Sequence, residues 1–173
     1  LSTNKYNIKV KNLSYSYNNY DYVLRNINLN IKEKDKVLVI GKSGSGKSTL
    51  FKIINKTYEI DNNKVFIGDI DVNNLNISNY VSYISQEESL FNDTIYNNIF
   101  INNKYNKEVI NITNVDVLIK NKNINLNTII EEDGINFSRG ERQKIILART
   151  LLKNNKILIL DEALNAIDEY EEI

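Results

Sequence analysis

The feature that most constrains the fold of this chain is a glycine-rich segment, residues 41–48, which reads G-K-S-G-S-G-K-S. A continuous apolar run, residues 36–40, precedes the segment, and a sequence with helical character follows it at about residues 47–55. A continuous apolar run is typical of a strand that is buried on both faces of a parallel sheet. The order of strand, glycine-rich turn and helix therefore predicts an α/β fold with a mostly parallel core sheet and flanking helices.

The same segment matches the pattern G-x-x-x-x-G-K-[ST] in the structural context that this pattern requires. Glycines let the backbone wrap around an anion, and the helix N-terminus adds a partial positive charge. A lysine at the end of the loop can reach the β- and γ-phosphates of a nucleotide, and the following hydroxyl can ligate Mg²⁺. The residues predicted to bind a nucleoside triphosphate are Gly41, Ser43, Gly44, Ser45, Gly46, Lys47, Ser48 (also a metal ligand) and Thr49, the last at the α-phosphate.

Composition excludes several other classes of protein. The 22 basic and 22 acidic side chains balance, whereas a general nucleic-acid or lipid-surface binder normally has a basic excess. Because the sequence contains no cysteine and no histidine, it offers no disulfide framework and no ordinary zinc site. Its apolar runs are also much shorter than the roughly 18 residues that cross a bilayer.

The length of 173 residues predicts a single domain, and the apolar periodicity predicts its elements. Alternating apolar residues between positions 6 and 31 predict antiparallel strands joined by a turn at residues 18–19. Further predicted elements are strands at 65–67, 81–84 and 156–160, short helices within 94–120, and helices at 140–153 and from 163. We expect an antiparallel β-subdomain at 1–35, a catalytic core at 36–86 and 154–173, and a helical subdomain at 87–153.

Two adjacent carboxylates follow the strand predicted at residues 156–160. Asp161 and Glu162 would lie at the carboxyl end of that strand, which is where ligands bind in open α/β sheets. An aspartate at this position can hold Mg²⁺ through water, and a neighbouring glutamate can act as the general base that activates a water molecule. An Asp-Glu pair is also an ordinary helix start, but the phosphate-loop pattern upstream favours the catalytic interpretation.

Residues 137–143 read F-S-R-G-E-R-Q, which resembles the L-S-G-G-Q-R-Q signature of the ATP-binding-cassette (ABC) ATPases. That family's other motifs are matched in order along essentially the whole chain. The resemblance implies the ABC ATPase fold, a P-loop NTPase core with an antiparallel β-subdomain and a helical signature subdomain. It also implies hydrolysis of ATP with Mg²⁺ between two cassettes that are arranged head to tail.

The resemblance assigns roles to individual residues. Tyr17 would stack on adenine through its π face, with other nearby tyrosines, Tyr15, Tyr20 and Tyr22, as alternatives. Gln86 looks like the glutamine that touches Mg²⁺ and the attacking water, and Asp168 looks like the aspartate at the dimer seam. Ser138 and Gly140 would bind the γ-phosphate that the opposite subunit holds.

Two further segments suggest the exporter subtype. Residues 91–99 are similar to the F-x-x-T-I-x-x-N-I segment of exporter cassettes, and residues 128–134 are similar to the loop before their signature, with Glu132 as its glutamate. In that group both segments face the transmembrane helices. The resemblance therefore implies a transmembrane domain fused at the N-terminal side, a second cassette, and a location at the cytoplasmic face of the cell membrane. Exporters of peptides or bacteriocins are one group with these features.

The chain departs from the family pattern at three points. Arg139 replaces a signature glycine and Glu141 replaces the usual glutamine, so that Arg139 would either add positive charge near the nucleotide or pair with Glu141. Glu131 stands where the exporters' loop has glycine. The switch histidine is missing, which we interpret as truncation, because the family places it beyond the position of Ile173; natural loss would instead predict a slow, regulatory site.

Three other functions compete with an exporter ATPase. An importer ATPase differs from it mainly in the segment at residues 94–99, and a nucleotide-gated regulator of low turnover is disfavoured by Glu162. A chromosome-maintenance ATPase head would need a long coiled coil between the phosphate loop and the signature, and no heptads are present there.

Overall fold

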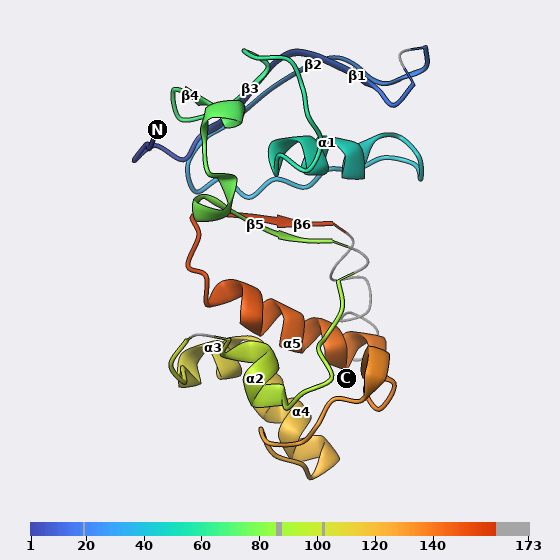
Figure 1. Ribbon diagram of the computed structural model, residues 1–173, viewed down its shortest axis with the longest axis vertical. Helices are drawn as coiled ribbons and strands as arrows, with labels where there is room; N and C mark the ends of the chain where they lie inside the picture. Colours follow the sequence, from blue (N-terminus) through green and yellow to red (C-terminus); the bar gives the residue numbers. More distant parts are fainter. Residues whose placement is uncertain (19, 86–87, 102, 162–173) are drawn as a thin grey trace. The chain divides into compact units, whose positions relative to one another are not determined.

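The computed structural model describes residues 1–18, 20–85, 88–101 and 103–161 (Figure 1). The chain divides into two compact units, Leu1–Val81 and Ser82–Ile173. Each unit has its own sheet. No helix in the described part of the chain has both the length and the apolar character needed to cross a bilayer.

The first unit is built on a four-stranded sheet with the strand order β2-β1-β3-β4. Its strands are β1 (Ile8–Ser16), β2 (Tyr22–Ile31), β3 (Val65–Ile67) and β4 (Ile70–Asp71), and each pair of neighbours is antiparallel. The alternation of apolar and polar residues places Ile8, Val10 and Leu13 in the core. The prediction of antiparallel strands between residues 6 and 31 is therefore confirmed.

One helix, α1 (Lys47–Ile54), follows the glycine-rich loop, as predicted. Its apolar face buries Leu50, Ile53 and Ile54. Two 3₁₀ turns, η1 (Val72–Asn74) and η2 (Ile77–Asn79), follow β4.

The strand predicted at residues 36–40 is wrong. The structure assigns no strand to these residues, and Val37, Leu38 and Ile40 are 51%, 82% and 84% exposed. A continuous apolar run shows that a segment can be buried on both faces, but a strand also needs neighbours that supply hydrogen bonds to its backbone. None of the four strands in the first unit's sheet pairs with this run.

The second unit consists of a two-stranded sheet and a group of helices. Strands β5 (Val81–Ile84) and β6 (Ile157–Leu160) pair with each other, and their arrows run in the same direction in Figure 1. The helices are α2 (Ile95–Ile99), α3 (Lys107–Ile112), α4 (Val115–Lys122) and α5 (Arg139–Leu151), with a 3₁₀ turn η3 (Glu132–Gly134) before α5. These elements confirm the predicted strands and short helices of this region.

The core of the second unit gathers around α5. Its centre consists of fully buried side chains, namely Ile95, Ile99, Val115, Ile130, Ile145 and Ala148. The pattern of α5, with apolar residues on one face, accounts for its packing against α2, α3 and α4. This core fixes the position of the N-terminus of α5, where the signature residues lie.

Candidate functional site

The glycine-rich loop of the first unit depends on backbone conformations that favour glycine. Gly44 and Gly46 have φ angles of 77° and 91°, in the left-handed region. Gly46 is the N-cap residue of α1, and a Cβ built on it would lie 2.8 Å from a methyl carbon of Leu24. At Gly41 a Cβ would lie 2.6 Å from the Ser45 hydroxyl. The loop therefore needs glycine at Gly46 both for conformation and for space.

The lysine at the end of the loop is held by the loop itself. Lys47 Nζ donates hydrogen bonds to the carbonyl oxygens of Gly41 and Lys42, at 2.8 and 3.0 Å. An ammonium group has three protons, so one remains for a further acceptor. Residues 41–45 and Ser48 are exposed, so the mouth of the loop is open to a ligand.

The first unit also brings Tyr17 to the helix that follows the loop. The hydroxyl groups of Tyr17 and Thr49 lie 2.6 Å apart, and Thr49 is buried in the first turn of α1. Tyr17 is nevertheless 58% exposed. A largely exposed aromatic side chain thus lies next to the helix that begins at the glycine-rich loop.

The residues expected after β6 are only partly described. Asp161 is 4% exposed, accepts a hydrogen bond from the Tyr83 hydroxyl at 3.0 Å, and donates its backbone N–H to the Ile84 carbonyl. Glu162, Gln86 and Asp168 lie outside the described residues, so their predicted roles stay predictions.

Each unit has a side chain with an oxygen of the kind that Mg²⁺ accepts beside a nucleotide. Mg²⁺ is commonly held by one or two protein oxygens and by substrate phosphates rather than by a dedicated protein cage. The Ser48 hydroxyl and the Asp161 carboxylate are oxygen donors of this type. In the described part of the chain no group of three or more carboxylate, histidine or cysteine side chains could hold a metal ion unaided.

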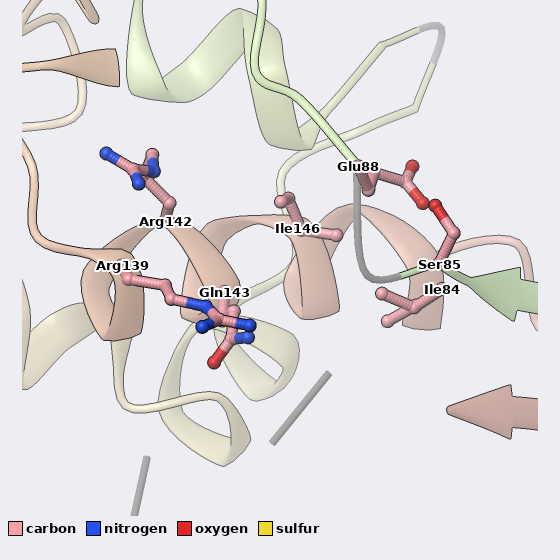
Figure 2. Close-up of a pocket in the computed structure, with 7 residues that line it drawn as sticks. All are labelled: Ile84, Ser85, Glu88, Arg139, Arg142, Gln143 and Ile146. Carbon is pink, nitrogen blue, oxygen red and sulfur yellow. The ribbon is translucent and has the colours of Figure 1, made fainter. Parts of the chain in front are cut away.

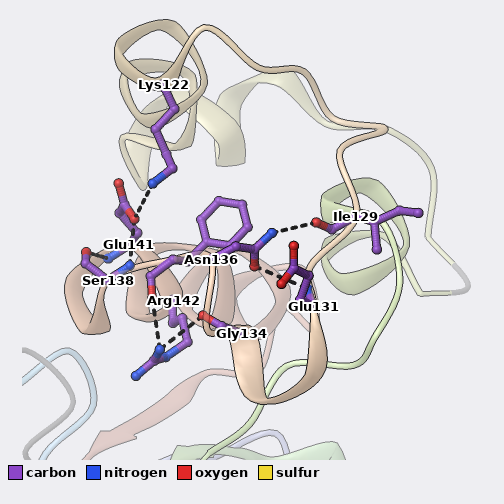
Figure 3. Close-up of polar contacts among 9 residues, drawn as sticks. Lys122, Ile129, Glu131, Gly134, Asn136, Ser138, Glu141 and Arg142 are labelled. Carbon is purple, nitrogen blue, oxygen red and sulfur yellow. Dashed lines mark hydrogen bonds and ion pairs between the residues drawn. The ribbon is translucent and has the colours of Figure 1, made fainter.

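The signature residues form the N-terminus of α5 (Figure 3). Ser138 caps the helix by accepting a hydrogen bond from the Glu141 N–H, while the Glu141 carboxylate accepts from the Ser138 N–H at 2.7 Å. This reciprocal capping box satisfies two amide groups that the helix leaves open. Gly140 lies in the first turn, and the Ser138 hydroxyl keeps its own proton to donate.

The two unusual signature residues do not pair with each other. Glu141 forms its ion pair with Lys122 on α4, at 3.2 Å, so the alternative in which Arg139 pairs with Glu141 is wrong. Lys122 also lies 5.2 Å above the Phe137 ring. The physical reason is capping, since the bond to the Ser138 N–H turns the Glu141 carboxylate back toward the helix start and α4.

Arg142 ties the loop before the signature to α5. Its guanidinium donates to the carbonyl oxygens of Gly134 and Phe137, at 3.1 and 2.9 Å (Figure 3). Asn136 adds a second link, because its side chain donates to the Ile129 carbonyl and accepts from the Glu131 N–H. The loop at residues 129–137 is thus hydrogen-bonded along its length.

The two segments that suggest the exporter subtype lie side by side. Thr94 and Ile129 form an antiparallel bridge, and the Ile130 N–H donates to the Asp93 carbonyl at 2.9 Å. The Asn97 amide and the Thr94 N–H donate to the Asp93 carboxylate and hold its pKa below the usual value. The side chain of Asn98 lies inside the same turn and forms hydrogen bonds to its backbone. No role was predicted for Asn98 from the sequence, where only its place in the segment 91–99 distinguishes it.

A cavity of about 110 Å³ lies beside the first turns of α5 (Figure 2). Its lining includes Glu88 after β5 together with Arg139 and Gln143. Pockets that enclose organic ligands generally measure about 300–1,000 Å³. This cavity is therefore too small to be the nucleotide site, although it places Arg139 next to the segment that follows β5.

We predict that the Lys122–Glu141 pair contributes about 0.5–1 kcal/mol, because both side chains are partly exposed. Lys122→Ala should lower the free energy of unfolding by this amount, whereas the same substitution in a Glu141→Gln background should cost less. Hydrogen exchange of the α4 and α5 amides in the four variants measures the difference. Equal costs in both backgrounds would show that the packing of Lys122 on Phe137, and not its charge, is the source of the effect.

Members of one protein family are similar to this chain along most of its length. The profile of the ABC transporter family matches residues 24–165. The chain is 37% identical to an export ATP-binding/permease protein of Rickettsia typhi, over 95% of this chain and 30% of that protein. It is 36% identical to the lactococcin-G-processing and transport ATP-binding protein of Lactococcus lactis, over 97% of this chain and 26% of that one.

A solved structure gives the same result for the fold. The structure of a bacterial Atm1-family ABC exporter with ATP bound matches 98% of this chain and 31% of its own with a TM-score of 0.85, at 25% sequence identity. The chain therefore spans less than a third of the length of these relatives. Since the matched region includes the glycine-rich loop, the signature and Asp161, the chain belongs to the ABC transporter family, as an ATP-binding domain of the exporter type with the ABC ATPase fold.

Proposed function

We propose that this chain is the ATP-binding and ATP-hydrolysing cassette of a membrane exporter, acting at the cytoplasmic face of the membrane. The observation that carries the proposal is the phosphate loop with the Tyr17 ring beside its helix. The exporter relatives support the direction of transport. The transmembrane partner would be fused on the N-terminal side.

In this proposal the first unit grips the nucleotide. The loop amides and the N-terminus of α1 surround the β- and γ-phosphates, and Lys47 turns its remaining proton toward them. Tyr17 stacks on the adenine, and Ser48 ligates Mg²⁺ with Gln86 and, through water, Asp161. When bound, Mg²⁺ neutralises charge on the phosphates.

The second unit acts on a nucleotide that another copy of the chain holds. Ser138 and the first-turn amides of α5 donate hydrogen bonds to that γ-phosphate, because the capping box leaves the Ser138 proton available. Glu162 then accepts a proton from a water molecule that is in line with the γ-phosphate. Formation and opening of this head-to-tail dimer would drive the transmembrane helices.

Lys47→Ala tests the phosphate loop directly. Loss of one charge-assisted contact to phosphate is expected to weaken binding of a fluorescent ATP analogue by about 10- to 100-fold. The matched control is Lys42→Ala, which removes an exposed ammonium group from the same loop and should change the affinity less than about threefold. Equal affinities for wild type and Lys47→Ala would refute the proposed site.

A further inference from the structure

Three tyrosine rings form one cluster in the first unit. The rings of Tyr15 and Tyr58 are stacked, with their centroids 5.7 Å apart and their planes 12° apart. The Tyr17 ring stands at 89° to both, with centroid distances of 5.3 and 5.6 Å. Edge-to-face contacts of this kind favour one orientation of a ring because the positive edge of one meets the negative face of the other.

Tyr17 is therefore fixed from two sides while one part of it stays open. Its hydroxyl is 2.6 Å from that of Thr49, which is 6% exposed and held in α1. Tyr15 and Tyr58 are half-buried, whereas Tyr17 is 58% exposed. These contacts together restrict the angle of the Tyr17 ring.

Tyr15 and Tyr58, the two rings that contact Tyr17, are suited to holding its ring in place. Burial and the neighbouring tyrosines raise the pKa of Tyr15, so this phenol stays neutral at ordinary pH. Lys52 of α1 places its ammonium 5.7 Å from the centre of the Tyr58 ring, which links this ring to the helix as well. The cluster thus connects α1, through Thr49 and Lys52, to the ring that faces solvent.

We infer that Tyr15 and Tyr58 are positioning residues, which hold the Tyr17 ring at the angle and distance at which a purine base stacks when its phosphates occupy the glycine-rich loop. They would not touch the nucleotide themselves. This inference rests on the proposed function and adds residues to its base-binding half. An isolated phosphate chain has no base, so its binding would not depend on the cluster.

The test compares two ligands, MgATP and Mg-tripolyphosphate, by calorimetric titration of wild type and Tyr58→Leu. We expect Tyr58→Leu to weaken ATP binding by about 5- to 20-fold, which is part of the effect of a base–aromatic stack, and to leave tripolyphosphate binding within twofold. Tyr58→Phe keeps the ring and should restore ATP affinity. Tyr6→Leu is the control, because the Tyr6 ring lies against Tyr80 and outside the three-ring cluster.

A second variant, Tyr17→Phe, tests the same inference if Tyr58→Leu does not fold. Tyr17→Phe removes only the hydroxyl that meets Thr49, and it should weaken ATP but not tripolyphosphate. Unchanged ATP affinity in Tyr58→Leu, or equal losses for both ligands in a folded variant, would overturn the inference. Failure of the wild type to bind tripolyphosphate would instead contradict the proposed phosphate loop, so the two failures are distinguishable.

Discussion

Gly46→Ala is expected to reduce ATP affinity by more than about 100-fold, because the backbone angle at this position disfavours any residue with a side chain and because the surrounding atoms leave no space for one. Its φ of 91° is unfavourable for alanine, at a cost of about 1–2 kcal/mol. The new Cβ would also lie 2.8 Å from Leu24 Cδ2 and 3.2 Å from the Val23 carbonyl oxygen. Relief of these contacts requires the start of α1 to move, and the loop amides move with it.

Gly44→Ala is the matched control for this prediction. Gly44 shares the left-handed conformation, with φ 77°, but a Cβ there meets no atom within 4 Å. We expect this variant to lose about tenfold in ATP affinity, from conformation alone. The measurement is a titration with a fluorescent ATP analogue, with circular dichroism to confirm folding. Similar losses in the two variants would show that conformation, and not the contact with β2, sets the loop.

The sequence pattern predicted the loop but could not show which of its glycines has no space for a side chain. Gly41, Gly44 and Gly46 all fit G-x-x-x-x-G-K-[ST] or its variable positions, and the pattern contains no information on what lies opposite each one. A Cβ at Gly46 would meet Leu24, which is far from it in the chain. Local periodicity specifies helices and strands, whereas such contacts depend on how these elements pack.

The same distinction explains the wrong strand and the missed residues. The run at residues 36–40 has the composition of a buried strand, but composition does not reveal whether hydrogen-bonding neighbours are present. Tyr58 is one tyrosine among 11, and only its stacking on Tyr15 distinguishes it. The helix α5, by contrast, was predictable because its capping residues and its apolar face are both local.

Replacement of Asn98 is expected to cause a large loss of stability in the second unit, because Asn98 is a fully buried polar side chain with several hydrogen-bond partners. Its Oδ1 accepts from the Phe91 N–H at 2.8 Å, and its Nδ2 donates to the carbonyl oxygens of Phe91 and Thr94, both at 3.0 Å, and of Asp93 at 3.3 Å. These bonds shape the turn that joins the loop at residues 128–134. Asparagine is suited to this position because it offers both a donor and an acceptor.

Asn98→Leu keeps the branched shape of the side chain but leaves the Phe91 N–H without its acceptor, while the carbonyl oxygens of Phe91, Asp93 and Thr94 each keep one backbone donor. At about 1–3 kcal/mol for the unsatisfied N–H and about 0.5–1 kcal/mol for each lost hydrogen bond, the second unit should lose about 2–5 kcal/mol of stability. Hydrogen exchange of the α2 and α5 amides measures this loss within the second unit, because a chain of two compact units need not unfold in a single transition.

The control is Asn97→Leu, because Asn97 is exposed and its side chain donates a hydrogen bond to the Asp93 carboxylate at 2.8 Å. It should cost less than about 1 kcal/mol, and the pKa of Asp93 should rise toward its usual value because that pKa is lowered chiefly by the Asn97 amide. If the two variants exchanged equally fast, the stability of this turn would come from its apolar packing, since only Asn98 supplies the buried hydrogen bonds.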